Sequence, residues 1–237
     1  MTEATTSRIA RITGLAYLGI IFSGIFGEFL VRMALVEPGD AATTTINIAG
    51  AESWFRAALA ADLLMIALDI GVAVGLYVLL RPVHAPLARL AAALRLIQAA
   101  VLGANLMNMA AALRWATQAA AGATGSEVAR SMVLGSMELH RVVYDLGLVF
   151  FGFACLVLGH LLRVSGLVPK LLGVGLMLAG VVYLLGSFSV VLAPEFAPII
   201  DPLYVLTLVS ELALAAWLSI KGIWSPSRAQ RASAEFA

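Results

Sequence analysis

Residues 171–193 read LLGVGLMLAGVVYLLGSFSVVLA and contain no charged side chain. A helix needs about 20 mostly apolar residues to cross the hydrocarbon core of a bilayer. This stretch reaches that length, and Pro169 before it and Pro194 after it mark its ends. The sequence therefore predicts a transmembrane helix here.

Five further stretches have the same length and apolar character, although each holds at least one charged residue. They are residues 12–36, 54–80, 87–115, 136–162 and 203–224. Turn-forming residues separate them, and the third connection, residues 116–135, is long enough to hold a short interfacial helix. We predict an all-α fold, with residues 1–237 forming one domain of six transmembrane helices and residues 225–237 a short cytoplasmic tail.

Composition supports a membrane environment. Of the 237 residues, 62% are hydrophobic and 12% are charged, and the mean hydropathy is +0.98. A water-soluble domain carries about 25% charged residues, so a soluble enzyme is excluded. The net charge of +1 and the lack of a basic stripe argue against a nucleic-acid partner. The lipid bilayer is the expected partner.

Charged residues of the connections predict the orientation of the chain. Basic residues gather on one set of connections and at both ends: Arg8, Arg11, Arg81, Arg89, Arg163, Lys170, Lys221, Arg228 and Arg231. The opposite connections are acidic, with Glu37, Asp40, Glu52, Glu127, Glu195 and Asp201 against a single Arg130. Cytoplasmic loops carry the excess of Lys and Arg. We therefore expect a multi-pass protein of the cell membrane with both termini in the cytoplasm.

Several ionisable and amide side chains lie well inside the predicted helices, where a charge without a partner costs about 2.5–3.5 kcal/mol to insert. Glu28, Asp62, Asp145 and Glu211 lie eight or nine residues from the outer end of their spans, and Asn105 and Asn108 lie ten and seven residues from it. At about 1.5 Å per residue, these groups share a depth of about 12 Å below the outer surface. The sequence therefore predicts a polar site in the outer half of the bundle.

Helical spacing indicates which of these groups share a face. Glu28 and Arg32, Arg141 and Asp145, and His140 and Tyr144 are each four residues apart. The candidate ligand-binding residues are Glu28, Arg32, Asp62, Asn105, Asn108, His140, Arg141, Tyr144, Asp145 and Glu211. Asp69 and Arg95 fall in the inner half of consecutive helices, and we expect them to form a buried ion pair.

The sequence contains only weak matches to catalytic and metal-binding motifs. His140 and Asp145 form a His-x4-Asp pattern, but five residues of helix turn two side chains about 140° apart. As candidate catalytic residues, His140 would be a base, Asp145 would assist it and Ser136 would be a nearby hydroxyl. No Glu-x-x-His spacing occurs, so we expect no metal site, and no cofactor is identified. Cys155 is the only cysteine, which excludes an intrachain disulfide.

The order and spacing of several short motifs resemble those of one bacterial membrane family. These motifs are residues 27–32 (GEFLVR), 36–41 (VEPGDA), 94–99 (LRLIQA), 147–152 (GLVFFG) and 159–162 (GHLL), with Glu52, Phe55, Arg56, His140, Tyr144, Ser165 and Pro169. The resemblance covers residues 8–222 and is to a family catalogued as a domain of unknown function, number forty-three eighty-six. It implies a polytopic membrane protein and supplies no reaction, substrate or cofactor.

Three functions remain open at this point. The preferred hypothesis is a protein that binds or transports a small charged or amphipathic molecule through a polar cavity. The alternatives are an intramembrane enzyme that acts on a lipid or lipid-linked substrate, and a structural or regulatory membrane subunit whose charges all pair internally. The sequence does not determine the oligomeric state.

Overall fold

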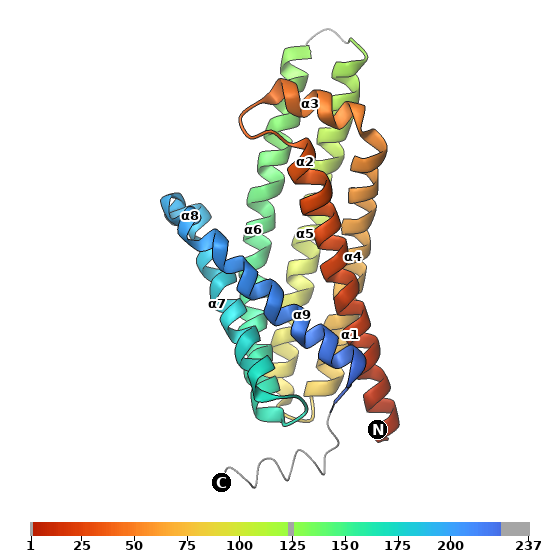
Figure 1. Ribbon diagram of the computed structural model, residues 1–237, viewed down its shortest axis with the longest axis vertical. Coiled ribbons are helices and arrows are strands. Elements are labelled where there is room, and N and C mark those ends of the chain that lie inside the picture. The colour runs from red at the N-terminus through yellow and green to blue at the C-terminus, as the bar shows by residue number, and fades with distance from the viewer. Residues whose placement is uncertain (1, 123–125, 224–237) are drawn as a thin grey trace. The chain divides into compact units, whose positions relative to one another are not determined.

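The computed structural model describes residues 2–122 and 126–223, and the elements within these ranges are helical with no β-strand. Six helical segments are long and apolar enough to cross a membrane (Figure 1). They are Glu3–Leu35, Glu52–Leu80, Ala85–Ala120, Glu127–Ser165, Lys170–Leu192 and Pro194–Ile220. The predicted all-α fold with six membrane-spanning helices is therefore confirmed.

Individual elements follow the chain in a simple order. They are α1 (Glu3–Ile25), the π-helix η1 (Phe26–Arg32), α2 (Met33–Leu35), α3 (Ala41–Gly50), α4 (Glu52–Leu80), α5 (Ala85–Ala120), α6 (Ser126–Ser165), α7 (Lys170–Leu192), η2 (Pro194–Phe196), α8 (Ala197–Ile200), η3 (Asp201–Leu203) and α9 (Tyr204–Ile220). Trp224, which was expected to end the sixth span, lies outside the described residues, as do Arg228 and Arg231.

The third connection is much shorter than expected. Helix α5 continues to Ala120 and α6 begins at Ser126, so most of residues 116–135 belong to these two long helices. The prediction of a short interfacial helix in this connection is wrong. Alanine has the highest helix propensity, and the alanine-rich end of α5 extends the helix past its apolar part. Gly122, with a φ of 72°, follows the end of that helix.

Helix α3 was not predicted. Asp40 caps it, because its carboxylate accepts hydrogen bonds from the Thr43 backbone N–H at 2.9 Å and from the Thr43 hydroxyl at 2.7 Å. These hydrogen bonds favour the charged carboxylate and lower the pKa of Asp40. Gly39, with a φ of 78°, makes the turn before the cap.

Contacts divide the chain into two compact units. Unit 1 comprises the described residues of Met1–Gly19, Leu68–Ala99 and Asp145–Ala237, and unit 2 comprises those of Ile20–Ala67 and Ala100–Tyr144. Helices α1, α4, α5 and α6 contribute to both units.

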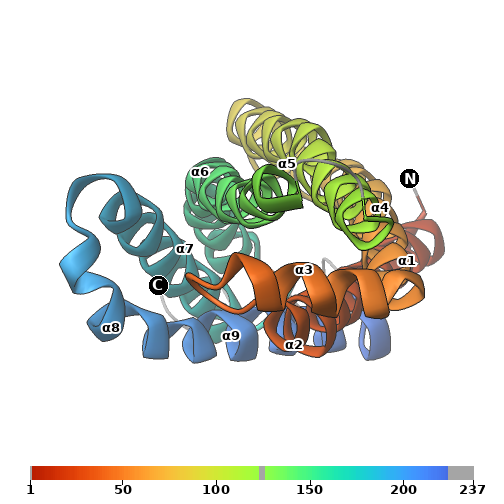
Figure 2. The same ribbon diagram turned by 90° about the horizontal axis from the view of Figure 1, so that it is seen from above.

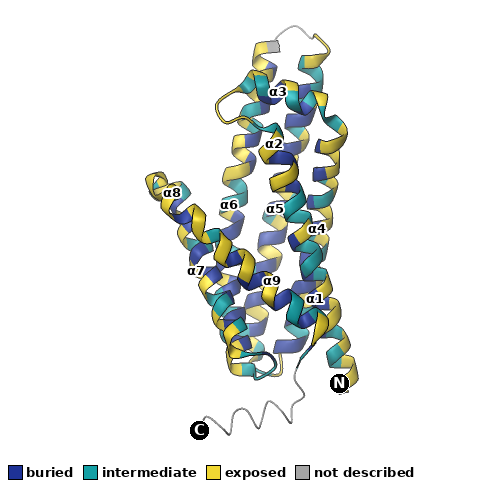
Figure 3. Ribbon diagram, in the orientation of Figure 1, coloured by how far each residue is buried: buried dark blue, intermediate teal, exposed yellow. Residues whose placement is uncertain are grey.

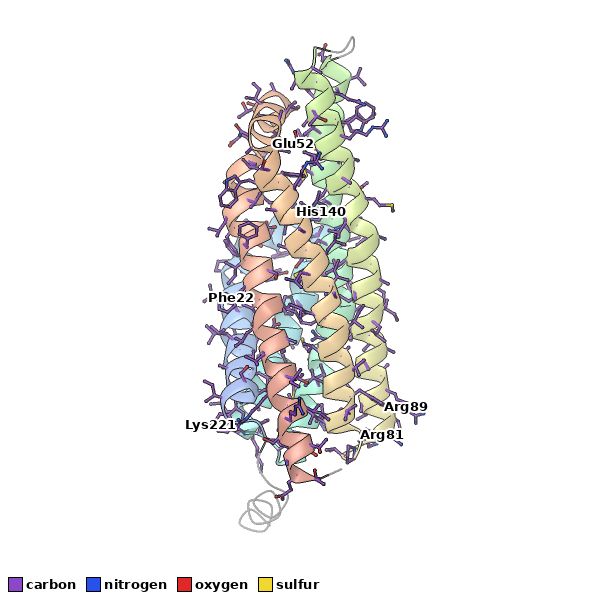
Figure 4. All side chains as sticks on the ribbon, turned by 90° about the vertical axis from the view of Figure 1, so that its right-hand side faces the viewer. Phe22, Glu52, Arg81, Arg89, His140 and Lys221 are labelled. Carbon is purple, nitrogen blue, oxygen red and sulfur yellow. The ribbon has the colours of Figure 1, made fainter. Side chains whose placement is uncertain are left out.

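In unit 1, helices α6 and α7 approach closely at glycines. A Cβ atom on Gly159 would lie 2.5 Å from the carbonyl oxygen of Gly173, and one on Gly180 would lie 2.7 Å from that of Gly152. Small residues let helices pack closely in membranes, and this is the role expected of these glycines. Arg81, Arg89 and Lys221 lie at one end of this unit (Figure 4).

In unit 2, α3 lies across the end of the unit, beside α2, rather than along the long helices (Figures 1 and 2). An apolar core joins α3, α4, α5 and α6, and it includes Ile48, Phe55, Met109 and Val133. Ile48 thereby fixes α3 against the ends of the long helices, although the outward Ile46 of the same helix is exposed.

Many residues of both units are exposed (Figure 3), and large apolar residues are common among them. Leu171 and Val205 in unit 1 and Phe22 and Met107 in unit 2 are among the many large exposed apolar residues. Water-soluble proteins rarely expose so many large apolar side chains, whereas contact with lipid tails favours them. The exposed surface therefore agrees with the six apolar spans in indicating a multi-pass membrane protein.

Candidate functional site

A π-helical segment carries the first two candidate residues. The segment η1, Phe26–Arg32, interrupts the first span between α1 and α2. π-Helices are rare, and short ones inside α-helices are frequently found at functional sites. This one contains both Glu28 and Arg32, and the sequence carried no signal for it.

Arg32 is the centre of a charged group in unit 2. Its side chain is buried, with 7% of its surface exposed, yet it contacts two carboxylates. Arg32 Nε donates to Glu28 Oε2 at 2.7 Å, and Nη1 donates to Asp62 Oδ2 at 2.6 Å. The Glu28 side chain is 53% exposed, whereas that of Asp62 is 3% exposed. One guanidinium thus neutralises a buried carboxylate and also holds a partly exposed one.

Gly27 makes room for this ion pair. A Cβ atom at position 27 would lie 2.9 Å from Asp62 Oδ1 and 3.2 Å from each terminal nitrogen of Arg32. The space beside Gly27 is therefore occupied by the carboxylate of α4 and the guanidinium of η1. The carboxylate of Asp62 and the guanidinium of Arg32 can occupy these positions because Gly27 has no side chain.

Two amides extend the polar group toward α6. Asn105 Nδ2 donates to the backbone carbonyl of His140 at 2.8 Å, and Asn108 Nδ2 donates to Asn105 Oδ1 at 2.9 Å. The His140 side chain lies between the helices (Figure 4) and is buried. Its ring centroid is 6.2 Å from that of Tyr144. His140 also interacts electrostatically with Arg32 and Glu28, so the amides, the imidazole and the charged residues belong to one cluster.

Two polar atoms of this cluster have no hydrogen-bond partner. They are Asp62 Oδ1 and His140 Nδ1, and both are buried. Nearly all buried polar atoms in proteins are hydrogen-bonded, so such atoms need an explanation. We call Glu28, Arg32, Asp62, Asn105, Asn108 and His140 the Arg32 cluster. Within the described residues, nothing forms a hydrogen bond with these two buried atoms.

Unit 1 contains a second buried arginine. The Arg95 guanidinium forms an ion pair with Asp69, and its side chain is 1% exposed. Its central carbon lies 5.3 Å from the ring centroid of Tyr17 and 4.9 Å from that of Phe151, so two aromatic rings flank the charge. The two residues expected to pair therefore do so, on α4 and α5.

Glu211 of α9 lies in the same unit and is held by two tyrosines. Tyr17 donates its hydroxyl hydrogen to Glu211 Oε2 at 2.8 Å, and Tyr183 donates to Oε1. Neither tyrosine was predicted as a site residue. The available signal was weak, because a tyrosine in an apolar span indicates only that its hydroxyl needs some partner. We call Asp69, Arg95, Tyr17, Tyr183 and Glu211 the Arg95 cluster.

The remaining candidate residues differ in burial and in the unit to which they belong. Arg141 is exposed, and Ser136, Tyr144 and Asp145 are partly buried. Asp145 and Glu211 belong to unit 1, whereas the other eight candidate ligand-binding residues belong to unit 2. His140 Nδ1 has no hydrogen-bond partner among the described residues, so it makes no hydrogen bond with Ser136. Within the described ranges, no group of three or more His, Cys, Asp and Glu side chains could hold a metal ion.

Comparison with known proteins gives a family and no activity. The family described as "Domain of unknown function (DUF4386)" matches residues 12–222. A protein from the archaeon Archaeoglobus fulgidus, described as "Uncharacterized protein", is 28% identical over 159 residues, which cover 67% of this chain and 80% of the relative. No solved structure matches the chain.

Proposed function

Because this chain belongs to the family described as Domain of unknown function (DUF4386), whose description assigns no activity, we propose its function from the site alone. We propose that unit 2 binds a small charged or amphipathic molecule at the Arg32 cluster, as the binding step of a binding or transport protein. The observation that carries the proposal is that the buried, unpartnered atoms Asp62 Oδ1 and His140 Nδ1 lie in the same cluster as the partly exposed carboxylate of Glu28.

Charge balance favours a ligand with a cationic or hydrogen-bond-donating end. Glu28 and Asp62 together carry two negative charges when ionised, and Arg32 supplies one positive charge. Asp62 Oδ1 accepts hydrogen bonds only, and an imidazole nitrogen accepts in one of its tautomers. An ammonium or similar group would supply donors to acceptors of this kind and neutralise the remaining charge.

The surroundings of the cluster suit a ligand with an apolar part. Val31, Met109 and Met137 are buried in the apolar core of unit 2, and Arg32 Nη1 lies 3.5 Å from the Met109 sulfur. Methionine packs adaptably around ligands of irregular shape. The partly exposed Glu28 would make the first contact with an arriving cation, and Arg32 would hold the two carboxylates in position.

The basic end of unit 1 supports the proposed orientation. Arg81, Arg89 and Lys221 all lie at that end (Figure 4), and an excess of basic residues is typical of cytoplasmic connections. We propose that this end faces the cytoplasm and that the protein resides in the cell membrane.

A matched set of ligands tests the function. The full chain in lipid nanodiscs is heated with a long-chain alkylammonium, the alkyl carboxylate of equal length and the uncharged alcohol. We expect the ammonium to raise the melting temperature and the carboxylate and alcohol to have less effect, because only the ammonium meets both the charge and the acceptors.

Two variants separate the site from general membrane binding. Asp62→Asn should abolish the ammonium effect. Glu52→Gln is the control, because Glu52 pairs with Arg56 at 2.7 Å in the same unit but both side chains are exposed, at 42% and 62%. Equal stabilisation of the wild type and Asp62→Asn, or no stabilisation of the wild type by the ammonium, would contradict the proposal. A loss of stability in Asp62→Asn without any ligand response in the wild type would support the structural-subunit alternative.

A further inference from the structure

Unit 1 holds two buried carboxylates that have different hydrogen-bond donors. Asp69 is bound by the Arg95 guanidinium, and Glu211 is bound by the hydroxyls of Tyr17 and Tyr183. Both carboxylates are buried in a span. The chemistry of the donors therefore decides which protonation states each carboxylate can adopt.

Asp69 is restricted to its ionised form. A guanidinium has five N–H donors, no acceptor, and does not lose its proton in proteins. A protonated Asp69 would leave Arg95 as a buried charge without a counterion, which costs several kcal/mol. The Arg95 side chain is buried, and Tyr17 and Phe151 flank its guanidinium.

Glu211 is not restricted in this way. A phenol hydroxyl is both donor and acceptor, so each tyrosine can donate to a carboxylate or accept from a carboxylic acid. Tyr183 also interacts with the hydroxyl of Thr207, which lies one turn before Glu211 on α9. When Glu211 gains a proton, its new O–H can donate to the Tyr183 oxygen while the Tyr183 hydrogen turns toward Thr207. All hydrogen bonds remain made in both states.

The groups around Glu211 leave one negative charge without a counterion when Glu211 is ionised. The ionisable groups that face it are Tyr17 on α1, Asp69 on α4, Arg95 on α5, Cys155 on α6 and Tyr183 on α7. Among these, Arg95 is the cation, and Asp69 already binds it. Neutrality of the cluster in a medium of low dielectric thus requires one further positive charge.

We propose that Glu211, between Tyr17 and Tyr183, is a proton-binding site that exchanges one proton while Asp69 stays ionised on Arg95. The carboxylate takes up one proton and becomes a carboxylic acid, and the reverse step releases it. No other bond forms or breaks. This site lies in unit 1 and does not depend on ligand binding at the Arg32 cluster.

Infrared spectroscopy of the full chain in nanodiscs tests the proposal. The C=O stretching band of a protonated carboxyl group is recorded while the pH of the buffer is changed across the neutral range, and the spectrum of Glu211→Gln is subtracted from that of the wild type. We expect a band in the difference spectrum that grows on acidification and disappears on alkalinisation. The same band should persist in Glu28→Gln, whose carboxylate lies in unit 2.

Two further variants test the proposal if Glu211→Gln does not fold. Tyr183→Phe removes one donor to the ionised carboxylate, so at a fixed neutral pH the protonated band should be stronger than in the wild type. Thr207→Val, of similar shape, removes the hydroxyl that receives the Tyr183 hydrogen, and the band should then be weaker.

Three outcomes would overturn the proposal. The first is a difference spectrum without a protonated-carboxyl band at any pH, which would show Glu211 permanently ionised. The second is a band that never titrates, which would show it permanently protonated. The third is a titrating band that survives in Glu211→Gln and disappears in Asp69→Asn, which would assign the exchangeable proton to the other carboxylate.

Discussion

The Arg32 cluster and the Arg95 cluster are built from similar parts and differ in how the parts are joined. Each has one buried arginine and two carboxylates. Arg32 contacts both of its carboxylates, and one of them, Glu28, is half exposed. Arg95 contacts Asp69, while Glu211 is held by phenols. The composition of a buried polar cluster therefore does not determine its chemistry. The type of hydrogen-bond donor that contacts each carboxylate does.

Burial separates the two clusters as well. In unit 1 the arginine is covered by aromatic rings, and its second carboxylate can be neutralised by a proton. In unit 2 a carboxylate remains partly accessible and a π-helix carries the arginine. Buried polar atoms without a hydrogen-bond partner occur in both clusters, since Asp69 Oδ2, Arg95 Nε and Arg95 Nη1 of unit 1 also have none among the described residues. We infer that the Arg95 cluster is closed to anything larger than a proton, whereas the Arg32 cluster is open to a ligand.

The largest expected effect on stability comes from disrupting the ion pair of the Arg95 cluster. Arg95→Met leaves Asp69 as a buried charge without a counterion and should lower the free energy of unfolding by about 3–5 kcal/mol. The double variant Asp69→Leu with Arg95→Met removes both charges and should recover most of that loss. Unfolding of the detergent-solubilised chain measures both. A double variant no more stable than Arg95→Met would contradict the assignment of Asp69 as the partner of Arg95.

A smaller effect on stability is expected from filling the space beside Gly27, next to the Arg32 cluster. Gly27→Ala brings a Cβ atom to 2.9 Å from Asp62 Oδ1, so the Arg32–Asp62 pair must shift. We expect a loss of about 1–3 kcal/mol in the free energy of unfolding, as for other overpacked sites.

Gly103→Ala is the control for this variant. Gly103 lies in helix α5 of the same unit, and a Cβ atom there would meet nothing within 4 Å. Alanine should raise the stability of that helix by up to about 1 kcal/mol. If both alanine variants are stabilising, the pair is not confined beside Gly27.

The smallest effect is expected at the surface pair. Glu52→Gln disrupts the exposed pair with Arg56 and should change the free energy of unfolding by less than about 0.5 kcal/mol. Glu28→Gln removes a contact with the buried Arg32 and should cost more, although both pairs have the same four-residue spacing. Equal effects in thermal unfolding would mean that burial of Arg32 adds nothing to its interaction with Glu28.

Much of the fold could be predicted because membrane spans depend on length and apolar content alone. The six spans follow from runs such as residues 171–193, where no charge interrupts the helix. Helix α3 was missed because it is short and packs through only a few side chains such as Ile48, although Asp40 before it is a typical cap. The π-helix at residues 26–32 has no residue pattern of its own and could not be found this way.

The candidate site could be predicted only in part, for a geometric reason. Counting along each helix gives the depth of a residue, and this places Glu28, Asp62 and Glu211 at a common level. It does not give the rotation of a helix about its axis or the order of the neighbouring helices. These two properties decide that Arg32 donates to Asp62, whereas Tyr17 and Tyr183 donate to Glu211. Asp69 and Arg95 were easier to pair because they lie on consecutive helices joined by a short connection.

The most direct test of the account compares ligand binding in two asparagine variants, one in each cluster. Stabilisation by the alkylammonium is measured in nanodiscs for Asp62→Asn and Asp69→Asn, each relative to its own unliganded melting temperature. The account predicts that Asp69→Asn retains the stabilisation seen in the wild type and that Asp62→Asn loses it. Loss of the ligand effect in Asp69→Asn with its retention in Asp62→Asn would contradict the assignment of the open site to the Arg32 cluster.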